Sequence, residues 1–334
     1  MTVMNLLDYI SFSHNRSTAA MEEWCEQVYY FPGQTRSAGA GIMVSCGIHG
    51  DETGPIDACA ALLHRLRKHR VQLPRPLLLI FGNPAAIAHR QRFVDFNLNR
   101  LFGAAQVGSP REDSIEARRA RQLEQACARF AQQCQGIDWH LDLHSTIKPS
   151  LIQRFALLPV TRREYRRPWA AALGQAGVGA LVRQTQRAHT FSQFSHDRFD
   201  ADSFTLECGS HATDKSTDTA LAQWLQGLVE ASTGAVGDVA RLPEYPMVEH
   251  QMTEHQMTEY RVAEAIVRRT EQFRFLIEES EPNFSEHPAG TAFYCDGVEP
   301  GEGVFRLPGP RYSLFLNSQV ALGQRAGLLL ERLQ

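Results

Sequence analysis

A histidine and a glutamate three residues apart, His49 and Glu52, could form half of a zinc site. Zinc binds imidazole nitrogen and carboxylate oxygen, and a catalytic zinc takes three protein ligands while one position stays open. The apolar run 42–44 before the pair predicts a buried strand, and Pro55 suits the first turn of a following helix. The pair is then expected at the carboxyl end of a strand, where open α/β sheets bind ligands. An exposed polar turn is the alternative unless a third ligand exists.

The segment 137–144 offers that third ligand. Polar and apolar residues alternate along it, so Asp138, His140, Asp142 and His144 are expected on one face of a strand. A polar face directed into a sheet costs free energy unless it is paired or ligated. We therefore expect His144, which closes the strand, to be a ligand, and Asp142 to orient a ligand imidazole. An edge strand with one solvated face is the alternative.

Strands and helices that could position these residues alternate through the first 240 residues. The continuous apolar run 77–81 is typical of a strand buried on both faces of a parallel sheet. Further strands are expected at 155–160, 178–182 and 204–206, and helical patterns occur at 19–28, 55–70, 112–133, 164–175 and 218–232. This alternation predicts an α/β domain with helices on both faces of the sheet.

The composition changes near residue 240, where 241–246 has the features of a linker. The five-residue sequence 250–254 is then repeated at 255–259, which indicates a small tandem duplication whose two histidines are more typical of solvated than of metal-binding side chains. Short strands are expected at 260–270, 273–278, 291–295, 304–307, 313–316 and 327–333. We expect a catalytic domain over residues 1–240 and a small β domain over residues 241–334.

Overall composition excludes several classes of protein. The 334 residues are 43% hydrophobic and 21% charged with a net charge of −3, which does not favour nucleic acid or an anionic membrane as partner. No apolar segment is long enough to span a bilayer and the first residues do not form a signal peptide, so a cytoplasmic location is expected.

The seven cysteines lack paired spacing, which favours reduced thiols, and Cys208 has no histidine in an obvious partner motif. Neither GxGxxG nor a Walker loop is present, and the oligomeric state stays open.

His49, Glu52 and the distant His144 together resemble the zinc carboxypeptidase clan, in particular its succinylglutamate desuccinylase and aspartoacylase branch. The motifs that carry the resemblance are Asn83-Pro84, RFVDFNLNRLF at 92–102, DLHS at 142–145 and TLECG at 205–209. The resemblance covers most of the chain. It implies a zinc-carboxypeptidase-like mixed or parallel sheet with helices on both faces, a smaller C-terminal β domain, and one zinc ion per chain.

The same resemblance implies roles for four further residues. Glu207 matches the catalytic glutamate of the family, which acts as general base on the attacking water and then as general acid to the leaving amine. Arg92 is implied to polarise the scissile carbonyl and to stabilise the oxyanion, while Asn99 and Arg100 hold a substrate carboxylate. A solvated glutamate at a strand end and a charged surface loop are the alternatives without the family.

The expected substrate is a small N-acyl amino acid. The whole chain, notably the segment 155–159, resembles desuccinylases more than aspartoacylases. This resemblance implies hydrolysis of N2-succinyl-L-glutamate to succinate and L-glutamate, the closing step of the succinyl-transfer route of arginine catabolism. An aspartoacylase-like hydrolase of another N-acyl amino acid and an inactive zinc-binding scaffold are the alternatives. Because this substrate has three carboxylates, more cations are expected; Lys148, Arg154 and Arg187 are candidates, although each is more typical of a surface charge.

Overall fold

The computed structural model describes residues 21–33, 40–69, 73, 75–103, 107–108, 110–163, 165, 169, 173–174, 177–210, 220–225, 257–297 and 303–333. The expected linker at 241–246 and both histidines of the repeat lie outside the described residues. The helices expected at 164–175 and 218–232 lie mostly outside them, and residues 220–225 are helical.

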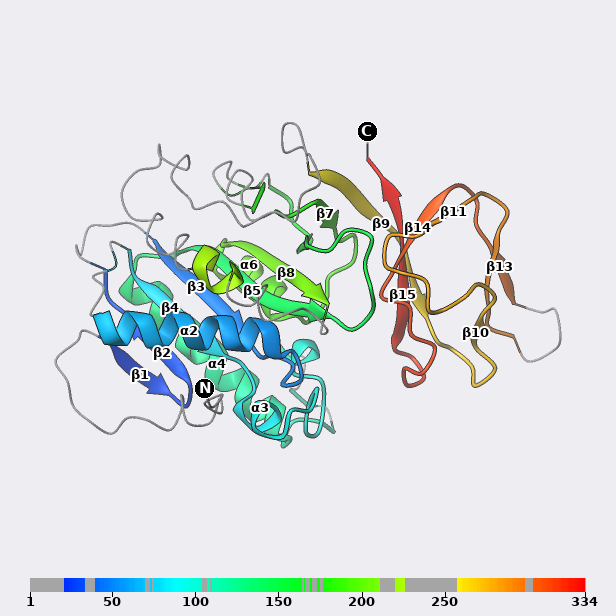
Figure 1. The fold of residues 1–334 in the computed structure, drawn as a ribbon. Coiled ribbons are helices and arrows are strands. Elements are labelled where there is room, and N and C mark those ends of the chain that lie inside the picture. Colours follow the sequence, from blue (N-terminus) through cyan, green and yellow to red (C-terminus); the bar gives the residue numbers. More distant parts are fainter. Residues whose placement is uncertain are drawn as a thin grey trace, which may run out of the picture.

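A twelve-stranded mixed sheet runs through the described part of the chain, in the order β1-β2-β4-β3-β5-β8-β6-β7-β9-β15-β14-β11 (Figure 1). Its first eight strands in chain order are β1 (Glu22–Cys25), β2 (Val28–Phe31), β3 (Gly41–Cys46), β4 (Leu77–Phe81), β5 (Ile137–Thr146), β6 (Phe155–Leu158), β7 (Ala180–Arg183) and β8 (Asp202–Ser210). Strands β4, β3, β5 and β8 are parallel neighbours. Their carboxyl ends therefore meet at one edge of the sheet, the edge at which α/β folds place ligands.

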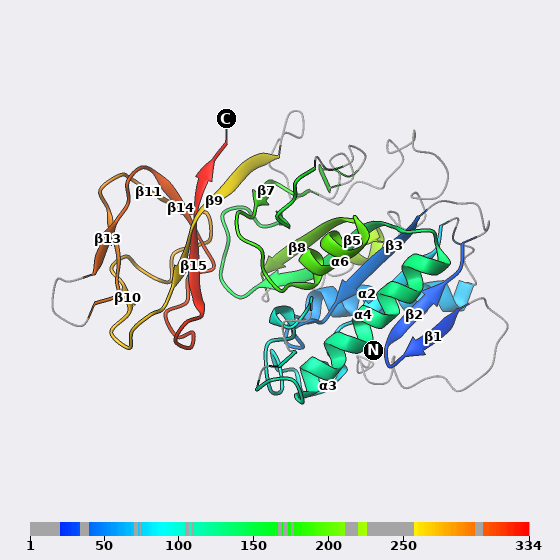
Figure 2. The same ribbon diagram turned by 180° about the vertical axis from the view of Figure 1, so that it is seen from behind.

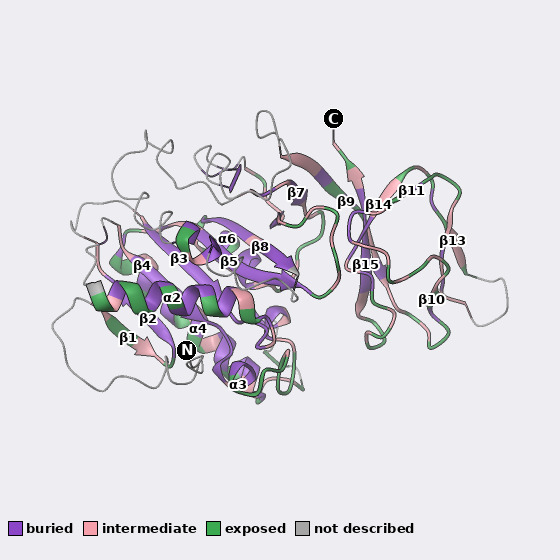
Figure 3. Cartoon of the chain, viewed as in Figure 1, coloured by how far each residue is buried: buried purple, intermediate pink, exposed green. Residues whose placement is uncertain are grey.

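Helices cover both faces of this sheet, as the sequence predicts. Helix α2 (Thr53–His69) packs on one face, and α4 (Ile115–Gln133) and α6 (Phe191–Phe199) pack on the other, as the two opposite views show (Figure 1, Figure 2). The central strands are buried along most of their length (Figure 3). Two short elements follow β4, namely α3 (Pro84–His89) and the 3-10 helix η1 (Leu98–Arg100).

The helical pattern expected at residues 19–28 is wrong, because the described part of this segment forms an antiparallel hairpin of β1 and β2. Gln27 has a φ of 56°, a left-handed conformation that reverses the chain between the two strands. The aromatic residues of this segment suit a sheet: Trp24 stacks on Tyr30 with ring centroids 4.7 Å apart. Apolar spacing alone does not separate a short helix from a hairpin.

The C-terminal segment is a small β structure, as expected, built from β9 (Thr258–Val267), β10 (Arg274–Phe275), β11 (Glu286–His287), β12 (Ala292–Cys295), β13 (Val304–Arg306), β14 (Arg311–Leu314) and β15 (Arg325–Arg332). Strands β10, β12 and β13 form a separate three-stranded sheet. Strand β9 pairs in parallel with β7, so the main sheet continues into this C-terminal segment. The boundary expected near residue 240 stays a prediction.

A hydrophobic core is shared between the two parts of the sheet. It includes Phe155 and Val182 from β6 and β7, together with Tyr260 and Leu328 from β9 and β15. In the described part of the chain no helix is long and apolar enough to cross a membrane. All seven cysteines are free thiols, as the sequence predicts.

Candidate active site

The turn that carries His49 and Glu52 follows β3 and contains two glycines, Gly47 and Gly50. Gly47 has a φ of 63°, which glycine adopts at little cost. At Gly50, a Cβ atom would lie 2.1 Å from the backbone carbon of Ala86 in α3. Only glycine therefore permits this close approach of the turn to α3, which buries the turn at the carboxyl end of the strand.

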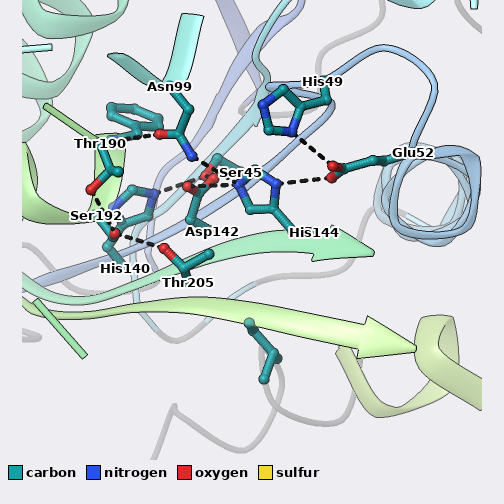
Figure 4. Close-up of polar contacts among 12 residues, drawn as sticks. Ser45, His49, Glu52, Asn99, His140, Asp142, His144, Thr190, Ser192 and Thr205 are labelled. Atoms are coloured by element: carbon teal, nitrogen blue, oxygen red, sulfur yellow. Dashed lines mark hydrogen bonds and ion pairs between the residues drawn. The ribbon is translucent and has the colours of Figure 1, made fainter. Parts of the chain in front are cut away.

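Three buried side chains meet at this position. Nδ1 of His49 lies 2.7 Å from Oε1 of Glu52, and Nδ1 of His144 lies 2.8 Å from Oε2 of the same carboxylate (Figure 4). The three residues are only 2–4% exposed, and one ligand atom from each lies within 4.8 Å of the others. The fold thus brings the three predicted ligands together from the ends of β3 and β5.

The charges of these groups depend strongly on one another. Burial would raise the pKa of the Glu52 carboxyl, but the two imidazoles outweigh it and hold that pKa well below its usual range. Burial would lower the pKa of His144, but the carboxylates of Glu52 and Asp142 raise it well above its usual value. For His49, burial prevails and lowers the pKa. An ionised carboxylate therefore lies between the two imidazoles.

A network of buried, hydrogen-bonded polar side chains holds His144 in position. Oδ2 of Asp142 lies 3.1 Å from Nε2 of His144, as the spacing along β5 predicts. The other oxygen of Asp142 accepts a 2.6 Å hydrogen bond from the hydroxyl of Ser45, which also lies 2.9 Å from Nε2 of His140 (Figure 4). Nδ1 of His140 lies 2.6 Å from the hydroxyl of Ser195 in α6. The polar face of β5 is therefore paired inside the protein, and the alternative of a solvated edge strand is wrong.

The loop before η1 is held in place by Glu116, a residue for which sequence reasoning assigned no role. This fully buried carboxylate accepts hydrogen bonds of 2.6, 3.1 and 3.1 Å from three consecutive backbone amides, those of residues 94–96. It also accepts a 3.1 Å bond from Nδ2 of Asn83, the N-cap of α3. One side chain thus fixes the loop that carries Arg92 at one end and Asn99 at the other.

The three predicted residues of this loop lie around the buried cluster. Nη1 of Arg92 lies 3.4 Å from Oε1 of Glu52, and its side chain is 38% exposed. Oδ1 of Asn99 accepts a 2.9 Å hydrogen bond from the backbone N–H of Phe191, so its Nδ2 points toward His144, 3.5 Å from Nε2. Arg100 donates only to the carbonyl of Asn99 among the described residues. Its pKa is lowered to about 9 by burial and by the neighbouring guanidinium groups of Arg325 and Arg92.

Glu207 lies beside the cluster on the neighbouring strand, where it is paired with His144 in the parallel ladder of β5 and β8. It is buried, and its Oε2 has no hydrogen-bond partner among the described residues. Burial raises the pKa of this carboxyl to about 7; Glu52 adds to the rise, while His144 and Arg92 oppose it. A carboxyl group with a pKa near neutrality can both accept and return a proton.

Two family models match this chain. Residues 38–230 match the succinylglutamate desuccinylase/aspartoacylase catalytic domain, and residues 255–333 match the AstE/AspA barrel-sandwich hybrid domain. The chain belongs to the succinylglutamate desuccinylase/aspartoacylase family.

Relatives and solved structures of this family resemble the chain over nearly all of its length. A succinylglutamate desuccinylase of Photorhabdus laumondii is 30% identical over 333 residues, which cover 97% of this chain and 95% of the relative. One from Erwinia tasmaniensis is 34% identical and covers 86% and 83% of the two chains. The crystal structure of succinylglutamate desuccinylase from Vibrio cholerae has a TM-score of 0.79 at 27% identity and covers 98% of this chain and 94% of that one. The expected fold class is confirmed.

The donor set of this family member fits a zinc ion. Two imidazoles and one carboxylate form a ligand set found in catalytic zinc sites. Nε2 of His49 lies 3.1 Å from the side-chain oxygen of Asn97, and Nε2 of His144 lies 3.1 Å from a carboxylate oxygen of Asp142. When Nε2 carries the proton toward that oxygen, Nδ1 of each ring presents its lone pair to the site. Sequence reasoning missed Asn97, which is distinguished only by its place in the RFVDFNLNRLF motif of this family.

The candidate cations behave differently from Arg92 and Arg100. Nζ of Lys148 lies 3.9 Å from Oε1 of Glu279, and Arg187 forms an ion pair with Asp197. Both candidate cations therefore already have an acidic partner in the protein. Arg154 interacts electrostatically with Cys208, which follows Glu207 along β8 and therefore points to the other face of the sheet. The burial of Cys208 raises its pKa well above the usual value, which does not suit a nucleophilic thiolate. Instead, Arg325 at the start of β15 lies near Glu207 and Arg100, and sequence reasoning did not select it.

Proposed function

We propose that the protein is a zinc-dependent amidohydrolase that cleaves N2-succinyl-L-glutamate to succinate and L-glutamate. The observation that carries the proposal is the pairing of the buried cluster of His49, Glu52 and His144 with the buried carboxyl of Glu207 on the next strand. The substrate assignment is supported by relatives that are 30–34% identical over most of the chain and are named succinylglutamate desuccinylase. This reaction would close the succinyl-transfer route of arginine catabolism, in the cytoplasm.

His49, Glu52 and His144 would hold one zinc ion per chain. When bound, zinc supplies Lewis-acid chemistry by lowering the pKa of a water molecule to about 7 and by polarising a carbonyl group. Asp142 and Asn97 keep the two imidazoles oriented for this role, since each accepts a hydrogen bond from the Nε2–H group of its histidine.

Glu207 performs the proton transfers in this proposal. Its carboxylate accepts a proton from the attacking water as the water oxygen bonds to the amide carbon. The protonated carboxyl then donates that proton to the glutamate nitrogen as the C–N bond breaks. The pKa of about 7 suits both steps at neutral pH, because neither the acid nor the base form is strongly disfavoured.

Arg92, Asn99 and Arg100 act on the substrate in this proposal. The partly exposed guanidinium of Arg92 lies beside Glu52 and would stabilise the oxyanion that develops from the amide carbonyl. Asn99 has its carbonyl oxygen occupied by the Phe191 N–H, so its NH2 group is oriented as a donor toward the site. Arg100 has no carboxylate partner among the described residues and would bind a substrate carboxylate.

Release of glutamate from N2-succinyl-L-glutamate tests this proposal. We expect release by zinc-loaded protein, loss of activity after treatment with a chelator, and its return when zinc is restored. Metal analysis should give one zinc ion per chain. N-acetyl-L-aspartate, assayed in parallel, tests the aspartoacylase-like alternative. If neither substrate is cleaved by protein that contains zinc, the inactive scaffold is the better description.

A further inference from the structure

We propose that Arg325, supplied by the C-terminal β structure, forms with Arg100 a cationic subsite that binds a carboxylate of the substrate. This inference rests on the proposed function and names a residue that determines substrate specificity at the same site. It gives the C-terminal strands a direct part in substrate recognition.

The position of Arg325 is set by an irregularity at the start of β15. Arg325 is paired with Val267 and Gly327 with Ile266, so β15 has one extra residue, Ala326, opposite β9. Such a bulge changes the direction of the neighbouring side chains. Ala326 is fully buried in the core of the C-terminal strands, whereas Arg325 is only half-buried. At Gly327 a Cβ atom would lie 2.6 Å from Leu316, so the local backbone packs tightly beside the bulge.

The C-terminal strands are attached to the loop that follows His144, which places Arg325 relative to the site. The backbone of Asn283 donates to the carbonyl of Pro149 at 2.9 Å and accepts from the N–H of Leu151 at 3.0 Å. Its side-chain oxygen accepts a 2.9 Å hydrogen bond from Phe315. The nearby Lys148 contacts the backbone carbonyl and the carboxylate of Glu279. These bonds connect the segment between β10 and β11 to the loop that follows β5.

Arg325 is close to two residues of the candidate active site. Its guanidinium interacts electrostatically with the carboxylate of Glu207 and with the guanidinium of Arg100, which in turn interacts with that of Arg92. Burial lowers the pKa of Arg325, although Glu207 opposes this effect. The guanidiniums of Arg92 and Arg325 thus both interact with the carboxyl of Glu207, and that of Arg100 interacts with both of them.

Among the described residues, Arg325 forms no hydrogen bond or ion pair, and Arg100 donates only to a backbone carbonyl. Neighbouring guanidiniums that are partly removed from water and form no ion pair are unfavourable, because each loses hydration and repels the other. A carboxylate bound between the two guanidiniums would relieve both costs through charge-assisted hydrogen bonds. The substrate has such carboxylates on its succinyl group and on its glutamate.

Substitution of Arg325 tests the proposal, with Arg332→Gln as a control, since Arg332 is exposed at the other end of the same strand. The zinc-loaded wild-type protein is assayed first with N2-succinyl-L-glutamate, and a lack of activity at this stage contradicts the proposed function rather than the role of Arg325. In active protein, we expect Arg325→Gln to lower kcat/KM about 10- to 100-fold, mainly through KM, with unchanged zinc content. The control should stay within about twofold of wild type.

Inhibition by the two products shows which carboxylate is bound. A higher Ki for succinate alone assigns Arg325 to the succinyl carboxylate, a higher Ki for L-glutamate alone assigns it to the glutamate, and either result supports the subsite. Unchanged KM and Ki values for both products overturn it. If Arg325→Gln does not fold, Arg325→Lys is used: it keeps the charge but loses the bidentate fork, and a several-fold rise in one Ki is expected. Ki values equal to those of the control would then overturn the proposal.

Discussion

His144 and Glu207 are paired across the parallel strands β5 and β8, so an imidazole of the buried cluster and a buried carboxyl lie side by side at one edge of the sheet. Residues at paired positions of a ladder share a face of the sheet. The backbone hydrogen bonds of the two strands therefore fix the separation between the predicted metal ligand and the predicted base. Rigid strands position catalytic groups more accurately than loops do.

Replacement of Glu207 by Gln should separate metal binding from catalysis. We expect zinc content to be retained, because Glu207 is not one of the three predicted ligands, and kcat to fall about 10²- to 10⁴-fold, because the amide cannot accept the proton. Zinc analysis and initial rates with N2-succinyl-L-glutamate measure the two effects. Glu259→Gln, at a half-exposed glutamate on β9, is the matched control. Activity of Glu207→Gln equal to that of the control would remove Glu207 from the mechanism.

Zinc should stabilise the folded protein through His49, Glu52 and His144. Added at about 100 times its Kd, zinc is expected to raise the free energy of unfolding by about 2.7 kcal/mol, because it binds the folded state preferentially. Thermal unfolding of metal-free protein with and without zinc measures this shift. In Glu52→Gln, which loses the central carboxylate of the cluster, the shift should nearly vanish. A shift of the same size in that variant would place the metal elsewhere.

Glu116 should affect activity through the loop of Arg92. In Glu116→Gln, one acceptor oxygen becomes a donor group, so part of the bonding to the amides of residues 94–96 is lost. We expect a loss of about 1–3 kcal/mol in stability and a lower kcat/KM as Arg92 and Asn99 lose their fixed positions. Urea unfolding and steady-state kinetics measure the two effects. The control is Glu124→Gln on the same helix, since Glu124 accepts from the amide of Gly103, which lies outside residues 94–96. The role of Glu116 is contradicted if the two variants behave alike.

His140 should make stability depend on pH. Burial lowers the pKa of this imidazole to about 4, while Asp142 raises it and His144 lowers it further. The unfolded chain, with a histidine pKa of about 6.5, therefore binds more protons between pH 4 and 6.5 than the folded protein. The contribution of His140 is complete above about pH 6.5 and is lost as the pH falls toward 4, by about 3 kcal/mol at most.

Urea unfolding of metal-free protein at several pH values tests this prediction. The wild type should lose more stability than His140→Gln between pH 7 and 5, because glutamine does not titrate. Parallel stability curves for the two proteins would show that other groups cause the acid sensitivity.

Local features of the sequence were sufficient to predict the three residues of the buried cluster. His49, Glu52 and His144 each follow or close an apolar strand, and parallel strands bring their carboxyl ends to one edge. The helices α2 and α4 and the strands β4 and β5 were likewise predicted from apolar periodicity, because each buries a continuous face. The hairpin of β1 and β2 was not, since its strands are short and its turn depends on a left-handed Gln27.

The roles of Glu116, Asn97 and Arg325 depend on the tertiary structure. Glu116 has the sequence features of an ordinary acidic residue in the first turn of a helix, and only the packing of α4 against the loop turns it into a buried acceptor. Arg325 is separated from Glu207 by more than one hundred residues, and the pairing of β9 with β7 together with the bonds of Asn283 brings it to the site. Periodicity and motifs report which faces are buried and which groups could react. Contacts between distant segments arise only when the chain has folded. The same holds for the burial that shifts the pKa of a side chain or leaves a guanidinium without an ion-pair partner.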